Sequence, residues 1–354
     1  MYDTMDNPFL DFFHVPNSQE LLDIAFKKAM KSSAQVSKNA AILIKAKKKE
    51  HKRIKVAIDE IINRILLVIK RVPMIDDLPD FYRELASLIV DVDELRLTLG
   101  KLNGILPILS QIERESSKRL SRIENPKEAD QIRRAAFGRI SSIVNKQNAN
   151  LEYLNEIRGD LRRIPSLDYT SPCVVVAGYP NVGKSSIVKL VSTNKKLEVQ
   201  EYPFTTKELK LGHLEIQRRF DSIKIQIMDT PGILDRPMPR RNKIELKAIL
   251  ALRVISDLIL FVFDPTPACG YSIDSQIELY QEIHHNFTKE GTTKMFILIN
   301  KMDLASSEEV DFLLKKLGLE EGDYILTNAL TGENIDKIIS FLHKYYHLEI
   351  KSQL

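Results

Sequence analysis

A glycine-containing segment in the middle of the chain carries residue types that bind phosphate groups. Gly178-Tyr-Pro-Asn-Val-Gly-Lys-Ser185 follows the apolar run Val174-Val-Val-Ala177 and precedes a helical pattern. Glycines let the backbone wrap around phosphates, so that N–H groups and a helix N-terminus face the anion. Lys184 would bring a positive charge to the β- and γ-phosphates, and Ser185 a hydroxyl to Mg²⁺. The residues expected to contact the nucleotide here are Gly178, Asn181, Val182, Gly183, Lys184, Ser185 and Ser186.

Two further segments carry groups that suit Mg²⁺ and the γ-phosphate. Asp229-Thr-Pro-Gly232 follows the run Ile223–Met228, where the carboxylate can hold Mg²⁺ through water and the Gly232 N–H can contact the γ-phosphate. In Tyr202-Pro-Phe-Thr-Thr206, a threonine can complete the Mg²⁺ shell while the γ-phosphate is present, and we favour Thr206 over Thr205. The predicted Mg²⁺ ligands are Ser185, Thr206 and Asp229, and the predicted catalytic residues are Lys184, Thr206 and Gly232.

A fourth segment indicates which base is bound. Asn300-Lys-Met-Asp303 follows the run Lys294–Ile299, and the Asp303 carboxylate can accept hydrogen bonds from N1–H and the exocyclic amine of guanine. Adenine does not offer this pair of donors, so the site would discriminate against ATP. Asn328-Ala-Leu330 follows the run Tyr324–Leu326, where a backbone N–H could meet guanine O6. GTP and GDP are therefore the predicted ligands, bound here by Asn300, Lys301, Asp303, Asn328, Ala329 and Leu330.

The residue after Gly232 predicts slow hydrolysis. It is Ile233, whereas a glutamine there would orient the attacking water. The missing catalytic group would come from elsewhere in the chain, from a cation or from a partner. Asn181 resembles the asparagine that binds K⁺ in several GTPases with a hydrophobic residue at this position. The alternative for Asn181 is a simple turn residue.

Four of these segments, those that contain Gly178, Asp229, Asn300 and Asn328, lie where strand-length apolar runs end. Such runs recur at Cys173–Ala177, Ile223–Met228, Leu258–Phe263, Lys294–Ile299 and Tyr324–Leu326, and helical patterns separate most of them. This alternation predicts an α/β fold with a mostly parallel, doubly wound sheet. An antiparallel hairpin is expected around residues 216–227. Residues 169–354 are thus predicted to form a GTPase domain.

Residues 1–168 have a different composition, with four of the 13 glycines and many helix-forming residues. Asn17 and Glu20 resemble a capping box, and Asn125-Pro126 an N-cap followed by the first helical residue. Helices are expected over about 17–32, 36–72, 79–100, a short stretch after 107, and 125–165. This half is predicted to be an all-α bundle of long antiparallel helices.

Composition sets the broad class. The chain has 44% hydrophobic and 28% charged residues, as globular proteins do, and no apolar run of membrane-spanning length. The first eight residues are acidic and lack the apolar core of a signal peptide. Cys173 and Cys269 have no neighbours at metal-ligand spacing and are expected to be reduced. We expect a cytoplasmic monomer without a membrane partner.

Charge is uneven along the chain. Residues 27–71 contain 14 Lys and Arg but only three Asp and Glu. Such an excess indicates an anionic partner, with nucleic acid the first candidate, although these side chains could simply solvate a helix face. A second basic cluster includes Arg114, Lys118, Arg119 and Arg122. The residues predicted to bind RNA are Lys45, Lys47, Lys48, Lys49, Lys52, Arg53 and Lys55.

These motifs resemble those of the Obg-related translation-associated GTPases, and more closely those of the nucleolar GTP-binding protein (Nog) family. The similar segments are Phe204-Thr-Thr-Lys-Glu-Leu209, Asp229-Thr-Pro-Gly-Ile-Leu-Asp-Arg-Pro237, Arg241-Asn-Lys-Ile-Glu-Leu246, Phe81-Tyr82 and Asp91-Val-Asp-Glu-Leu-Arg-Leu-Thr-Leu-Gly-Lys-Leu-Asn103. The resemblance implies a role in assembling the large ribosomal subunit, with the helical domain on ribosomal RNA in pre-ribosomal particles. Two departures are Asn328, where related GTPases usually have serine, and the lack of a long basic C-terminal tail, which suggests an archaeal-type member.

A second hypothesis belongs to another class of protein. The chain could be a regulatory switch whose helical domain binds protein partners and no RNA. A membrane-surface role for the basic helix is disfavoured, because residues 36–71 contain no Trp or Phe to anchor it. Scarce aromatic residues also favour structured RNA, bound through its backbone, over single-stranded RNA.

Overall fold

The computed structural model describes residues 7–37, 39–202, 208–217, 222–230, 234–235, 246–247, 249, 251–288 and 293–351. Contacts divide the chain into two compact units. The helical unit comprises Pro8–Leu78 and Ile89–Arg162, and the sheet unit Asn7, Pro79–Leu88 and Arg163–Leu354. The domain boundary predicted between residues 168 and 169 stays a prediction. Within the described ranges, no helix is both long enough and apolar enough to cross a membrane.

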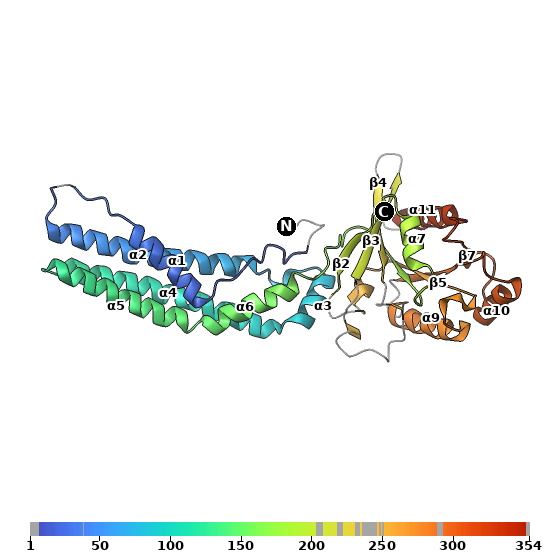
Figure 1. The fold of residues 1–354 in the computed structure, drawn as a ribbon, viewed down its shortest axis with the longest axis horizontal. Helices are drawn as coiled ribbons and strands as arrows, with labels where there is room; N and C mark the ends of the chain where they lie inside the picture. The colour runs from blue at the N-terminus through green and yellow to red at the C-terminus, as the bar shows by residue number, and fades with distance from the viewer. Residues whose placement is uncertain are drawn as a thin grey trace. The chain divides into compact units, whose positions relative to one another are not determined.

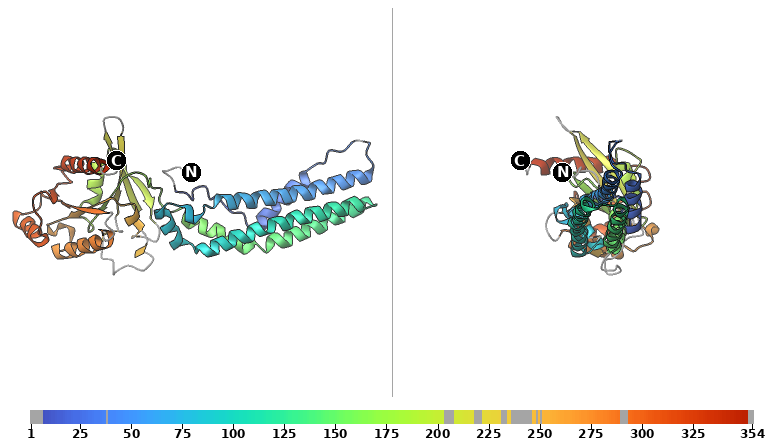
Figure 2. Two further views of the ribbon diagram at one scale, coloured as in Figure 1. Left: turned by 180° about the vertical axis from the view of Figure 1, so that it is seen from behind. Right: turned by 90° about the vertical axis from the view of Figure 1, so that its left-hand side faces the viewer.

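The helical unit is built on long helices that run side by side (Figures 1 and 2). They are α1 (Ser18–Lys31), α2 (Ile42–Arg71), α4 (Val92–Arg122), α5 (Pro126–Asn145) and α6 (Asn148–Leu161), with the short 3₁₀ helix η1 (Ile75–Asp77). Helix α2 buries Ile54, Ile58, Ile61 and Ile65, whose spacing of three and four residues forms one apolar stripe. Lys47 Nζ bonds the Ser121 carbonyl at 2.9 Å and Lys55 pairs with Glu113 at 3.3 Å, so α2 and α4 are antiparallel.

Helix boundaries differ from those expected in four places. The helix expected from about residue 36 begins at Ile42. The helix predicted over 79–100 is two helices, because Asp91 accepts hydrogen bonds from the N–H groups of Asp93 and Glu94 and caps a new one. Pro107 does not begin a helix but lies inside α4. The helix from Pro126 stops at Asn145, and α6 follows after two residues. The capping box at Asn17 and Glu20 is confirmed.

The sheet unit contains a seven-stranded sheet in the order β2-β3-β4-β1-β5-β6-β7. Its strands are β1 (Cys173–Ala177), β2 (Glu198–Glu201), β3 (Glu208–Gln217), β4 (Ser222–Asp229), β5 (Leu258–Phe263), β6 (Lys294–Ile299) and β7 (Tyr324–Leu326). Strands β4, β1, β5, β6 and β7 are parallel, whereas β2, β3 and β4 pair antiparallel. The predicted α/β fold after an all-α half is confirmed; only β2 was not expected.

Helices cover the sheet on both faces. Helices α7 (Lys184–Val191) and α11 (Ile335–Lys351) pack together, and α9 (Ile273–Thr288) lies on the other side (Figure 1). The remaining helices of the unit are α3 (Asp80–Ile89), α10 (Ser307–Leu317) and the 3₁₀ turns η3 (Leu252–Val254) and η4 (Pro267–Cys269). In such a fold the loops after the parallel strands meet at one edge, where ligands bind.

The segment that leads into β1 is held by side chains of the sheet. The amide of Gln226 on β4 accepts from the Asp168 N–H at 3.0 Å and donates to the Asp168 carbonyl at 2.6 Å. The Gln200 amide on β2 likewise accepts from the Ser166 N–H and donates to the Ser166 carbonyl. The Tyr82 hydroxyl of α3 similarly exchanges hydrogen bonds with the Leu167 backbone. Residues 163–168 are therefore part of the sheet unit.

Candidate functional site

The loop between β1 and α7 has a backbone that requires glycine at two points. Gly178 has φ +136°, and a Cβ there would lie 2.5 Å from the Val262 carbonyl oxygen. Gly183 has φ +102°, and a Cβ there would lie 2.1 Å from Asn300 Nδ2. Asn181 between them is also left-handed, with φ +63°. The loop therefore curls back on itself, as a phosphate cradle must.

Lys184 lies inside this curl. Its side chain is buried, and Nζ donates to the carbonyls of Gly178 and Tyr179, both at 2.7 Å. Burial lowers the pKa of Lys184, against the opposing charges of Asp235 and Asp229. A desolvated ammonium group interacts more strongly with a charged anion than a solvated ammonium group does.

Ser185 and Asp229 bring oxygen ligands together beside Lys184. Ser185 Oγ donates to Asp229 Oδ2, and Asp229 is fully buried at the end of β4. The other oxygen, Asp229 Oδ1, has no hydrogen-bond partner within the described part of the chain. Burial raises the pKa of Asp229, opposed by the Ser185 hydrogen bond. A buried carboxylate oxygen without a donor, next to a hydroxyl, fits the hard oxygen donor set that Mg²⁺ prefers.

Asn300 joins the phosphate loop to two loops at the ends of β6 and β7. Its Nδ2 donates to the Val182 carbonyl at 2.8 Å. Its Oδ1 accepts from the Ala329 N–H at 2.9 Å and from Thr327 Oγ1 at 3.2 Å. The buried Asn300 amide thus uses both its nitrogen and its oxygen in hydrogen bonds. These bonds connect the three loops that are predicted to bind phosphate and base.

The loop after β7 is also closed on itself. Asn328 is buried, and its Oδ1 accepts from the N–H groups of Leu330 at 3.0 Å and Thr331 at 3.3 Å. The Asn328 side chain thus closes a turn. The N–H groups of Asn328, Ala329 and Leu330 all have acceptors within the protein, so a contact to guanine O6 would share one of them.

The Asp303 side chain is exposed, as recognition of a base by its carboxylate requires. No hydrogen bond or ion pair to another described residue occupies it. Ser186 is exposed at the start of α7, and Val182 is buried, with only its carbonyl engaged by Asn300. The base-binding assignments stay predictions.

A buried network that was not expected from the sequence fixes Lys301. Lys301 Nζ lies 2.7 Å from the carboxylate of Asp264, a fully buried residue that follows β5. Asp264 also accepts from the Thr266 N–H and hydroxyl. The amide of Gln276 on α9 holds the Asp264 backbone from both sides, at 2.9 and 2.8 Å. Asp264 thereby fixes the position of Lys301, which belongs to the segment predicted to bind the base.

We expect Asp264→Asn to raise the Kd for GDP about tenfold, because Lys301 loses its anchor. In a Lys301→Met background the same change should add almost nothing, since Asp264 acts through Lys301. Asp257→Asn is the matched control, because Asp257 accepts the Cys173 N–H at the opposite end of β5. Calorimetric titration of the four cycle members measures the coupling. Additive effects of Asp264→Asn and Lys301→Met would show that the pair does not act as a unit.

Several predicted residues lie outside the described residues. They are Thr205 and Thr206, and with them Gly232 and Ile233. Tyr202, just before the first pair, is buried. The Mg²⁺ role of Thr206, the γ-phosphate contact of Gly232 and the consequence of Ile233 therefore stay predictions.

The residues predicted to bind RNA fall into two groups. Lys47 bonds the Ser121 carbonyl, Lys55 pairs with Glu113, and Arg53 pairs with the buried Glu50 at 2.9 Å. Arg133 pairs with the same carboxylate at 2.8 Å, so Arg53 belongs to a partly buried ion-pair cluster. These three predicted RNA contacts are engaged within the bundle. Lys45 is exposed.

The other group is available to an anion. Lys48, Lys49 and Lys52 on α2 are exposed and form no ion pair with described residues. The antiparallel register places the end of α4 beside them, with Arg119 and Arg122 exposed there and equally without an ion pair in the described ranges. We call Lys48, Lys49, Lys52, Arg119 and Arg122 the basic end of the bundle.

Comparison with known proteins gives consistent matches over both halves of the chain. The model of the NOG1 N-terminal helical domain matches residues 9–168, and the model of nucleolar GTP-binding protein 1 (NOG1) matches residues 243–303. Nucleolar GTP-binding protein 1 of Encephalitozoon cuniculi is 33% identical over 92% of this chain and 60% of its own length. An uncharacterized protein of Methanocaldococcus jannaschii is 32% identical over 86% of this chain and 83% of its own length.

Solved structures also match part of the chain. One is the putative nucleolar GTP-binding protein 1 of Plasmodium falciparum, 31% identical, with a TM-score of 0.42 over 54% of this chain and 95% of that one. The chain spans 60% and 50% of the length of the relatives from E. cuniculi and Drosophila melanogaster.

The expected cytoplasmic location is contradicted by these relatives. The matching proteins of D. melanogaster and Caenorhabditis elegans also bear the name nucleolar GTP-binding protein 1. The expectation rested on the lack of a signal peptide. That feature bears on secretion and does not distinguish one compartment inside a cell from another.

Proposed function

This chain belongs to the nucleolar GTP-binding protein 1 family, and from that premise we propose that it is a Mg²⁺-dependent GTPase that acts as an assembly factor for the large ribosomal subunit. GTP binding follows from the family. The observation that best supports the detailed site is the connection of phosphate loop, β6 loop and β7 loop through Asn300. It joins the loops proposed to bind phosphate and guanine at one edge of the sheet.

In this proposal Lys184 binds the β- and γ-phosphates, and Ser185, Asp229 and Thr206 would hold Mg²⁺. The metal supplies charge neutralisation on the phosphate oxygens. The Gly232 N–H contacts the γ-phosphate, and water attacks the γ-phosphorus in line. The raised pKa of Asp229 fits a carboxylate whose charge is stabilised only once a cation arrives.

Hydrolysis is proposed to be slow in the isolated protein. Ile233 has no group that could orient water. Asn181, in its left-handed conformation in the phosphate loop, is the candidate ligand for K⁺ as a substitute positive charge. A partner on the ribosome is the other source of the missing group.

The proposed RNA surface is the basic end of the bundle. Its five cations come from two antiparallel helices and are free of intramolecular ion pairs with described residues. Contacts of this kind hold phosphates without reading bases, so binding is expected to depend strongly on salt. The names of the relatives support a ribosomal setting.

Co-sedimentation with ribosomal subunits tests the proposed function. The full chain is mixed with subunits in GTP, GDP or a non-hydrolysable GTP analogue, at low and at high salt. We expect salt-sensitive binding to the large subunit that is stronger with the analogue than with GDP. Absence of binding in all three states would favour the alternative, a regulatory switch that binds protein partners only.

Asp303→Asn should shift base choice from guanine toward xanthine nucleotides. The asparagine amide offers a donor where the carboxylate offers only acceptors, and xanthine carries a carbonyl where guanine carries its amine. Competition between GTP and XTP for the labelled GDP complex measures the change. Asp311→Asn, also exposed, on α10, is the control. An Asp303→Asn variant that still prefers GTP would remove Asp303 from the base site.

A further inference from the structure

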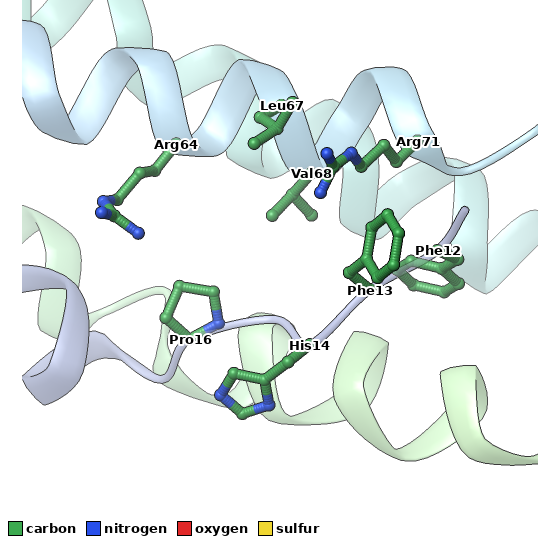
Figure 3. A pocket seen from close by; sticks show the side chains of 8 residues that line it. All are labelled: Phe12, Phe13, His14, Pro16, Arg64, Leu67, Val68 and Arg71. Carbon is green, nitrogen blue, oxygen red and sulfur yellow. The ribbon is translucent and has the colours of Figure 1, made fainter. Parts of the chain in front are cut away.

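The helical unit contains a pocket that neither the nucleotide site nor the basic end uses (Figure 3). One wall is the extended segment before α1, with Phe12, Phe13 and Pro16, and the other is the C-terminal half of α2. From α2 come Arg64, Leu67, Val68 and Arg71, which share one helix face because they are three, four and seven residues apart. The cavity volume is about 150 Å³.

The size and lining of the pocket suit one apolar side chain. An apolar cavity of ~150 Å³ accepts a group as large as benzene. Phe13 is 47% exposed and Leu67 46% exposed, so both leave apolar surface to water at the mouth of the pocket. Filling the pocket with a leucine, methionine or phenylalanine would remove that surface from water.

The rim of the pocket is positively charged. The Arg71 guanidinium lies over the Phe13 ring, with Cζ 4.5 Å from the ring centroid, and has no carboxylate partner among the described residues. Arg162 approaches the same ring at 5.8 Å. Arg64 is paired with Glu60, and His14 lies 3.4 Å from Glu20. Arg162 donates to the backbone carbonyls of Leu10 and Phe12, so among the described cations at the rim Arg71 is the one left to attract an anion.

We propose that this pocket binds a short acidic segment of a partner protein. An apolar side chain of the segment enters between Phe13 and Leu67, and a neighbouring Asp or Glu pairs with Arg71. A carboxylate suits this guanidinium because contact with Phe13 helps to hold it in place, and a guanidinium can donate two parallel hydrogen bonds to a carboxylate.

RNA fits the pocket less well. A base would have to stack on Phe13, the exposed aromatic ring at the site, yet guanidinium groups lie against this ring. A phosphate backbone would gain nothing from the apolar walls of Phe12, Pro16 and Val68. The combination of one apolar cavity and one unpaired cation is that of an acidic peptide with a hydrophobic anchor.

Selection from a phage library of random short peptides on the full chain tests the proposal. We expect the selected sequences to share an aliphatic or aromatic residue next to, or two residues from, an Asp or Glu. Synthetic fluorescent copies should bind the chain in polarisation assays. Leu67→Arg, which blocks the cavity, and Arg71→Glu, which reverses the rim charge, should each raise Kd at least about tenfold.

Matched controls come from the same unit. Lys70→Glu reverses the neighbouring exposed charge, and Leu97→Arg changes an exposed leucine on α4. Both should leave peptide affinity unchanged, and thermal melts verify that all four variants fold. Peptides without the predicted pattern, or binding insensitive to Leu67→Arg and Arg71→Glu, would overturn the proposal. It is equally overturned if Arg71→Glu weakens RNA binding as much as Lys49→Glu, or if Leu67→Arg dissociates a dimer of this chain.

Discussion

Lys184→Ala is expected to abolish GTP binding, with a rise in Kd of at least about 100-fold. A charged hydrogen bond contributes about 1.5–3 kcal/mol, and Lys184 is expected to make more than one to the phosphates. The amine is buried and desolvated, so its interaction with an anion is weakly screened. Titration calorimetry with GTP and GDP in Mg²⁺ measures the loss.

The same substitution should not lower the melting temperature of the nucleotide-free protein. Burial lowers the pKa of Lys184, so the folded state disfavours the charged amine, and this cost offsets the hydrogen bonds from Nζ to the Gly178 and Tyr179 carbonyls. Lys189→Ala on the exposed side of α7 is the matched control and should keep both affinity and stability. Tight GTP binding by Lys184→Ala would rule out the phosphate-loop assignment, whatever its melting temperature.

The strands of the sheet unit could be predicted because their signal is local. The runs Cys173–Ala177, Leu258–Phe263 and Lys294–Ile299 are observed with those bounds. Each is a short apolar run that a polar or glycine residue ends, and a motif follows where the strand stops. Loops after parallel strands meet at one edge, so the sequence also placed the phosphate and base motifs together.

Some helix ends, and the partners that side chains choose, could not be predicted from one sequence. Asp91 begins a helix inside a continuous helical pattern, and Pro107 lies within a helix that its packing against α2 and α5 maintains. The ion pair between Asp264 and Lys301 joins residues whose proximity exists only in the folded sheet. Likewise, Lys48 and Arg53 belong to one basic run, yet of these two only Arg53 pairs with the buried Glu50.

Lys48, Lys49 and Lys52 form no ion pair with described residues, so these lysines are expected to contact RNA. Replacing Lys48, Lys49 and Lys52 together by glutamate should remove most of the affinity for large-subunit RNA. Each phosphate contact contributes about 0.7–0.9 to the slope of log K against log salt, so losing three contacts lowers the slope by about two to three. The reversed charges also repel the backbone, which makes the loss larger than that of neutral variants. Filter binding at several salt concentrations gives both quantities.

The control must carry the same charge change on another surface. Lys189, Lys315 and Lys337 are exposed in the sheet unit, and their joint replacement by glutamate also changes the net charge by the same amount. Both triple variants should bind GDP like the unmodified chain, because none of the six lysines belongs to the predicted nucleotide loops. If the two variants lose RNA affinity equally, net charge alone governs binding. If only the Lys48, Lys49 and Lys52 variant loses it, the RNA contact is local to the basic end of the bundle, where the fold leaves these lysines without intramolecular ion pairs to described residues.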